Sequence, residues 1–139
     1  MKSPVDLLGM YLHLARTAAQ RQRPLVRDRL LVLAAAIAAD LQLPTIAACC
    51  RAKVLEHNPG HLLAHWPTVA EASEQDEFTA LRRQLVRKYS PERVEQLMHS
   101  LKIEWQTERA AYYSDEEYAA ALLGLTVADL VRQYGIDDV

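Results

Sequence analysis

The stretch of this sequence with the most reactive side chains is CCRAKVLEHNPGHLLAH, residues 49–65, which contains two cysteines and three histidines. Thiolate and imidazole groups are common zinc ligands, and zinc needs three or four of them within about 2.3 Å. Two ligands on one helix must be three or four residues apart to share a face. The stretch therefore raises the question of a metal site.

The spacing of these residues argues against such a site. His61 and His65 are four residues apart, but Pro59 begins a new element between His57 and His61. Cys50 and His57 are separated by about 10 Å along a helix axis, which is too far to share an ion comfortably. We predict no metal ligands and no cofactor. The cysteines are interpreted as core residues, because buried free cysteine behaves as a small hydrophobe.

The adjacent cysteines also bear on the cellular compartment. Neighbouring side chains of a helix point about 100° apart, so we expect no ordinary disulfide between Cys49 and Cys50. Free cysteines are typical of a reducing environment. The sequence therefore predicts a cytoplasmic protein.

Two pairs of residues have the spacing of an acid and a base on one helix face. Glu95 and His99 are four apart, and so are Glu104 and Glu108. Such pairs can supply proton transfer. The chain contains no glycine-rich phosphate loop, nucleophile elbow, zinc-protease motif or di-iron carboxylate pattern. We interpret the pairs as surface residues and predict no catalytic residues; a metal-dependent enzyme is kept as a second alternative.

Two clusters of basic residues are candidates for contact with an anionic partner. The first contains Arg16, Arg21, Arg23, Arg27 and Arg29, and the second contains Arg82, Arg83, Arg87, Lys88 and Arg93. Arginine favours bidentate contacts with carboxylate and phosphate groups. We assign the first cluster to partner binding. Aromatic residues that stack on bases are scarce near both clusters, which argues against nucleic acid.

The overall charge also argues against nucleic-acid binding. The net charge is −2, whereas dedicated nucleic-acid binders are usually basic. Residues 1–70 carry eight basic and four acidic side chains, and residues 71–139 carry eight and fourteen. We favour charges that pair within the molecule or lie on solvated faces over a basic surface for an acidic partner.

The C-terminal stretch EEYAAALLGLTVADLVRQYG, residues 116–135, has the pattern of a helix-turn-helix. Ala120, Gly124 and Leu130 occupy plausible positions for the small, turn and inward-facing residues. A recognition helix must offer donors to phosphates and bases, and here Arg132 stands alone beside Asp129. We interpret the segment as a structural corner and keep DNA or RNA binding as an alternative function.

Aromatic residues are the remaining candidates for contact with a partner. Tyrosine and tryptophan are enriched in interfaces because they combine apolar area with a polar group. We assign Tyr112, Tyr113 and Tyr118 to partner binding, and Trp66 and Trp105 to the core.

All of these residues must be positioned by helices, because helix signals recur along the chain and no stretch shows sustained alternation of apolar and polar residues. The predicted helices cover about 4–20, 24–41, 44–57, 59–64 and 76–88, with a brief helix after Thr68. A further helix begins at Pro91 and is expected to bend or divide at 101–103 before a segment that ends near Tyr113, and the last two helices cover 114–124 and 126–135. The phrases LPTIAAC, WPTVAEA and LTVADLV predict three threonine caps. The run LLVLAAAIAA, residues 30–39, is apolar nearly all round and should be central.

The composition supports one packed domain. Half of the residues are hydrophobic, with only four glycines and six prolines in 139 residues, as in ordinary globular proteins. The longest apolar run is about half of a bilayer crossing, and Asp6 and His13 interrupt any signal-peptide core. We expect residues 1–139 to form a single all-α domain, a compact orthogonal array of about six to eight short helices around the central apolar helix.

The absence of catalytic or ligand motifs leaves binding as the favoured function. We predict a small cytosolic protein–protein interaction module, with a protein partner or a second copy of the chain and without a membrane. The alternative is a nucleic-acid-associated regulator that uses the arginine clusters or the C-terminal corner.

Overall fold

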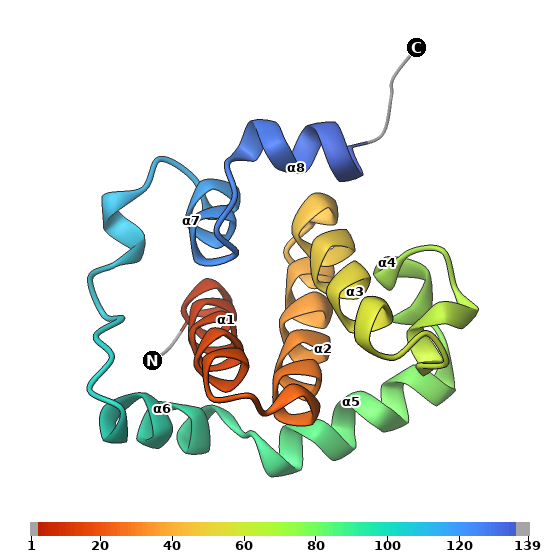
Figure 1. The fold of residues 1–139 in the computed structure, drawn as a ribbon, viewed down its shortest axis with the longest axis horizontal. Coiled ribbons are helices and arrows are strands. Elements are labelled where there is room, and N and C mark those ends of the chain that lie inside the picture. The colour runs from red at the N-terminus through yellow and green to blue at the C-terminus, as the bar shows by residue number, and fades with distance from the viewer. Residues whose placement is uncertain (1–2, 136–139) are drawn as a thin grey trace.

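The computed structural model describes residues 3–135, which form eight α-helices, two short 3-10 helices and no strand (Figure 1). The bounds are α1 Pro4–Gln20, α2 Pro24–Asp40, α3 Pro44–His57, η1 Leu62–His65, α4 Val69–Ala72, α5 Asp76–Lys88, α6 Pro91–Ser100, η2 Arg109–Ala111, α7 Asp115–Leu122 and α8 Val127–Tyr134. This confirms the predicted compact all-α domain of short helices.

Helix α2 is the centre of the fold. All residues from Leu30 to Ala38 are buried, and the helix contacts α1, α3, α4 and α5. Its run of small alanines lets the neighbouring helices approach closely. The central position predicted for this apolar helix is confirmed.

The other helices surround the row of α1, α2 and α3. In Figure 1, α5 and α6 run along one side of this row, and α7 and α8 lie on the opposite side. The chain between α6 and α7 passes outside α1. Within residues 3–135, no helix combines the length and the apolar character that a bilayer crossing requires.

Four helices end in the same hydrogen-bonded motif. At the end of α1, the Gln22 amide donates to the Ala19 carbonyl and the Arg23 amide donates to the Ala18 carbonyl. This is the Schellman arrangement, which needs a left-handed residue after the helix. The same pair of bonds follows α2, α6 and α7, and the left-handed residues are Gln22, Gln42, Lys102 and Gly124, with φ of 56°, 59°, 58° and 75°. Only Gly124 carries the usual sequence signal for this motif.

Most predicted helix starts are confirmed, and one threonine cap is wrong. The hydroxyls of Thr68 and Thr126 accept from the backbone amides three residues later. Thr45 instead lies inside α3, whose first flanking residue is Leu43. Its buried hydroxyl donates to Glu116 Oε2 at 2.8 Å and so joins α3 to α7. Pro44 explains the shift, because proline is favoured at the first helical position.

Two expected helices are corrected, and one expected break is confirmed. The predicted helix at 59–64 is only a 3-10 turn, Leu62–His65, and the side chain of the residue before it, His61, accepts from the Leu63 amide. The helix that begins at Pro91 does divide at 101–103: it ends at Ser100, and Lys102 adopts a left-handed conformation. The segment expected after the break is not an α-helix, because residues 101–108 are non-helical and only the 3-10 turn Arg109–Ala111 follows.

Candidate functional site

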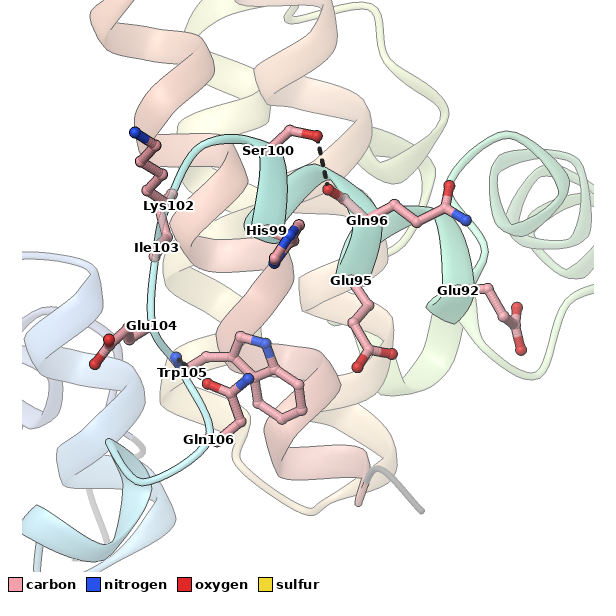
Figure 2. Close-up of a pocket in the computed structure, with 10 residues that line it drawn as sticks. All are labelled: Glu92, Glu95, Gln96, His99, Ser100, Lys102, Ile103, Glu104, Trp105 and Gln106. Carbon is pink, nitrogen blue, oxygen red and sulfur yellow. Dashed lines mark hydrogen bonds between the residues drawn. The ribbon is translucent and has the colours of Figure 1, made fainter.

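A cavity of about 820 Å³ lies between α6 and the non-helical chain that follows it. We call it the acidic groove (Figure 2). Its lining residues are Glu92, Glu95, Gln96, His99, Ser100, Lys102, Ile103, Glu104, Trp105 and Gln106.

Helix α6 forms one wall of the groove because of its amphipathic pattern. Val94 and Met98 are fully buried, which turns the polar face of the helix outward. The helix is held at its start by Ser90, whose hydroxyl accepts from the Arg93 amide at 3.2 Å. In Figure 2, Glu95 and His99 extend from this outward face.

The other wall is formed by the chain that leaves α6. Lys102 has a left-handed conformation (φ 58°), and the non-helical residues after it turn away from the axis of α6 toward α7 (Figure 1). Figure 2 shows the Trp105 indole beside α6 on the side of Glu95, with Gln106 next to it. Trp105 is half-buried and packs against the core from its edge. The groove therefore presents an aromatic surface next to carboxylates.

Acidic groups dominate the electrostatics of the groove. It is lined by three carboxylates, from Glu92, Glu95 and Glu104, and by one ammonium group, from Lys102. Glu92 and Glu104 are exposed and form no ion pair with any residue in the described range. The groove is therefore negative at neutral pH and suits a cationic group rather than an anion.

Only one of the two predicted acid–base pairs lies on a helix in the structure. Glu95 and His99 do share α6 and line the groove, although no residue between 3 and 135 forms a hydrogen bond with the His99 ring. The premise for Glu104 and Glu108 is wrong, because this segment is not a helix. Glu108 instead contacts His13 of α1, whose Nε2 lies 3.0 and 3.1 Å from its two oxygens.

The arginines assigned to partner binding differ in their burial and in their contacts within the fold. Arg16 donates from Nη2 to the carbonyl oxygens of Ala121 and Leu122, at 3.2 and 2.5 Å, and so caps the end of α7. Arg27 contacts the neighbouring Asp28 carboxylate and donates to the Lys53 carbonyl. Both therefore stabilise the fold. The remaining three are placed as follows: Arg21 and Arg23 are exposed, and Arg29 is half-buried.

The tyrosines assigned to partner binding lie at three different depths. Tyr118 is 1 % exposed, in the core against α1, so the expectation that it lies on a binding face is corrected. Tyr112 is half-buried, with its ring centroid 5.5 Å from that of Tyr118. Tyr113 is 94 % exposed and remains available to a partner.

The cysteines and histidines of residues 49–65 lie in separate environments in the fold. Cys49 and Cys50 are buried free thiols, and burial raises the pKa of both thiols. His57 Nδ1 contacts the Asp28 carboxylate, and the ring of His65 lies against Trp66. In the part of the chain that the structure describes, no three histidine, cysteine or acidic residues are grouped so that they could hold a metal ion.

The C-terminal corner consists of two short helices, α7 and α8, joined by a turn. Ala120 and Leu130 are buried, and Gly124 makes the turn between α7 and α8. Arg132 pairs with Asp129 at 2.5 Å, and α8 packs against α3. The one arginine of α8 is therefore engaged by a carboxylate on its own helix.

No protein-family model, curated protein or solved structure matches the chain. Sequence reasoning missed the acidic groove, although the alternation of Val94 and Met98 with charged residues indicates the outward face of α6.

Proposed function

We propose that this protein is an interaction module that binds a basic segment of a partner protein in the acidic groove. The observation that carries the proposal is the combination of two exposed carboxylates, from Glu92 and Glu104, with the half-buried Trp105 in one cavity of about 820 Å³. An arginine or lysine placed on the indole face gains a cation–π interaction, and the carboxylates select for its charge. The free cysteines favour the cytoplasm as the compartment.

The two kinds of contact contribute differently. Exposed ion pairs contribute about 0–1 kcal/mol each, and a cation over a tryptophan ring contributes about 0.5–2 kcal/mol. We therefore expect Trp105 to supply most of the affinity. The carboxylates increase the rate of association and make binding depend on salt.

The test is a titration with an arginine-rich hexapeptide, followed by the fluorescence of Trp105. Trp66→Phe serves as the background variant, so that Trp105 is the remaining tryptophan. We expect the fluorescence to change with saturation and the affinity to fall as salt is raised. The same peptide with glutamine in place of arginine should give no change.

Matched variants locate the binding site. Glu92→Gln combined with Glu104→Gln removes two negative charges from the groove while keeping the side-chain shape, and should weaken binding several-fold. Glu74→Gln removes an exposed carboxylate outside the groove and should leave binding unchanged. Equal binding by all three proteins would contradict the proposal. Sedimentation of the protein alone at low salt shows whether a second copy is the partner.

The alternative is a nucleic-acid-associated regulator. The observation in its favour is that Arg21 and Arg23 are exposed and pair with no carboxylate among residues 3–135. Binding of RNA or DNA that weakens with salt and is lost in Arg21→Gln with Arg23→Gln would support it. Arg27 is left unchanged in this test because it contacts Asp28 and the Lys53 carbonyl.

A further inference from the structure

A second cavity, of about 390 Å³, lies between α2, α5 and the turn that follows α3. Its apolar wall includes Val32, Leu81 and Leu85. Its polar groups come from all three segments and include Arg29, His61 and Lys88. The volume is at the small end of the range of about 300–1,000 Å³ for ligand sites, and an apolar wall with a few polar groups is their usual composition.

The cavity is where the two basic clusters of the sequence meet. Arg29 belongs to the first cluster and Lys88 to the second, and both line this one space. Arg29 is half-buried and forms no ion pair or hydrogen bond with another residue of the described range. Lys88 contacts the Tyr89 ring, with Nζ 5.9 Å from the centroid, and pairs with no carboxylate there. Two cationic groups are therefore available to a ligand.

The one carboxylate in the cavity lining, that of Asp28, already has partners outside the lining. Asp28 Oδ1 accepts from Arg27 Nε and Nη2 at 3.2 and 2.9 Å, and Oδ2 contacts His57 Nδ1. Neither Arg27 nor His57 belongs to the lining. The charges of Arg29 and Lys88 are consequently not cancelled within the cavity, and its net character is positive.

His61 adds a neutral donor to these cations. Its Nδ1 accepts from the Leu63 amide at 3.1 Å, so in the neutral ring the proton lies on Nε2. Burial lowers the pKa of His61, although the Asp28 charge opposes this effect. At neutral pH the ring therefore offers one N–H group rather than a charge.

We propose that this cavity binds a small organic anion, in which a carboxylate or phosphate monoester is joined to a short apolar chain. Arg29 and Lys88 bind the anionic group, and Val32, Leu81 and Leu85 contact the apolar chain. The site is separate from the acidic groove and opposite to it in charge. The proposal is therefore independent of the proposed function.

Three probes with the same apolar chain test the proposal: hexanoate, hexyl phosphate and hexan-1-ol, added to the full chain. Binding is followed by the ¹⁵N–¹H NMR shifts of the amides of residues 29–32 and 81–85. We expect at least one anion to bind and to shift these amides, with hexanol about tenfold weaker because it lacks the charge-assisted hydrogen bonds. The tighter anion identifies the head group.

Variants distinguish binding in the cavity from a general effect of the protein's charge on anion binding. Arg29→Gln and Lys88→Gln should each weaken anion binding by about tenfold, whereas Arg93→Gln, an exposed arginine outside the lining, should not change it. The proposal is overturned if neither anion binds at millimolar concentration, if hexanol binds as tightly, or if Arg93→Gln has the same effect. It is also overturned if a mixed-sequence RNA binds through Arg29 and Lys88 while neither hexyl anion does.

Discussion

Gly9 lies within α1 at a point where a larger residue has no space. A Cβ atom there would overlap the Tyr118 hydroxyl and lie 2.8 and 2.9 Å from the ring atoms Cζ and Cε2. Tyr118 is 1 % exposed, so its ring cannot move aside into solvent. The absence of a side chain at Gly9 therefore lets α7 pack closely on α1.

Gly9→Ala is expected to destabilise the protein by about 1–3 kcal/mol, the usual range for overpacking. In an exposed helix the same change would stabilise by roughly 1 kcal/mol, so the sign of the effect tests the packing. Urea unfolding gives the free energy of unfolding. Gly9→Ala with Tyr118→Phe should recover part of the loss, because the closest atom is removed; stabilisation by the single change would contradict this packing.

At the scale of the elements, three of the four Schellman-type helix ends use a residue that is strained there. Gln22, Gln42 and Lys102 have positive φ, which costs a residue other than glycine roughly 1–2 kcal/mol. The two Schellman hydrogen bonds at each of these ends offset the strain. The ends of α1 and α2 also turn the chain into the next helix within three residues.

Gln22→Gly is expected to raise the free energy of unfolding by about 1 kcal/mol, because glycine adopts positive φ without steric cost. Gln20→Gly is the matched control: it is also exposed, but it is the last residue of α1. That change should lower stability by up to about 1 kcal/mol. Chemical denaturation of the two variants measures their free energies of unfolding. A lower free energy of unfolding in both variants would show that glycine does not relieve strain at Gln22.

At the scale of the whole molecule, Tyr11 connects α1 to the junction of α5 and α6. Its hydroxyl donates to the Tyr89 carbonyl at 2.7 Å. Burial raises the pKa of Tyr11 to about 12, and nearby Arg82 partly opposes this. Burial also raises the pKa of Tyr118, and the Glu108 charge adds to the effect. Both tyrosines stay protonated in the folded state where the unfolded chain has lost the proton.

Stability is therefore expected to fall as the pH rises above 10, the ordinary tyrosine pKa, and to continue falling through pH 12 for Tyr11. Tyr11→Phe should lower stability at pH 7 by about 1 kcal/mol through the lost hydrogen bond. It should also make the fall above pH 10 shallower. Urea unfolding at several pH values compares the two proteins, and identical pH profiles would exclude Tyr11 as a cause.

The sequence by itself determined the helices. Local signals such as the threonine caps at Thr68 and Thr126, proline at the start of several predicted helices and the apolar run of residues 30–39 predicted the bounds of most helices and the central place of α2. These signals act within one or two helical turns, so they can be recognised without knowing the rest of the fold. The predicted capping role of Thr45 was wrong because α3 begins one residue earlier, at Pro44, which places Thr45 inside the helix, where its hydroxyl donates to the distant Glu116.

Only the tertiary structure decided what the functional candidates do. Arg16 and Arg29 look alike in the sequence, yet one caps α7 and the other lines a cavity with Lys88. The acidic groove likewise depends on the left-handed turn at Lys102, a position where the sequence has no glycine to indicate it. The physical reason is that the helical pattern is local, whereas a cavity is defined by which helix faces meet, and that depends on packing between residues far apart in the chain.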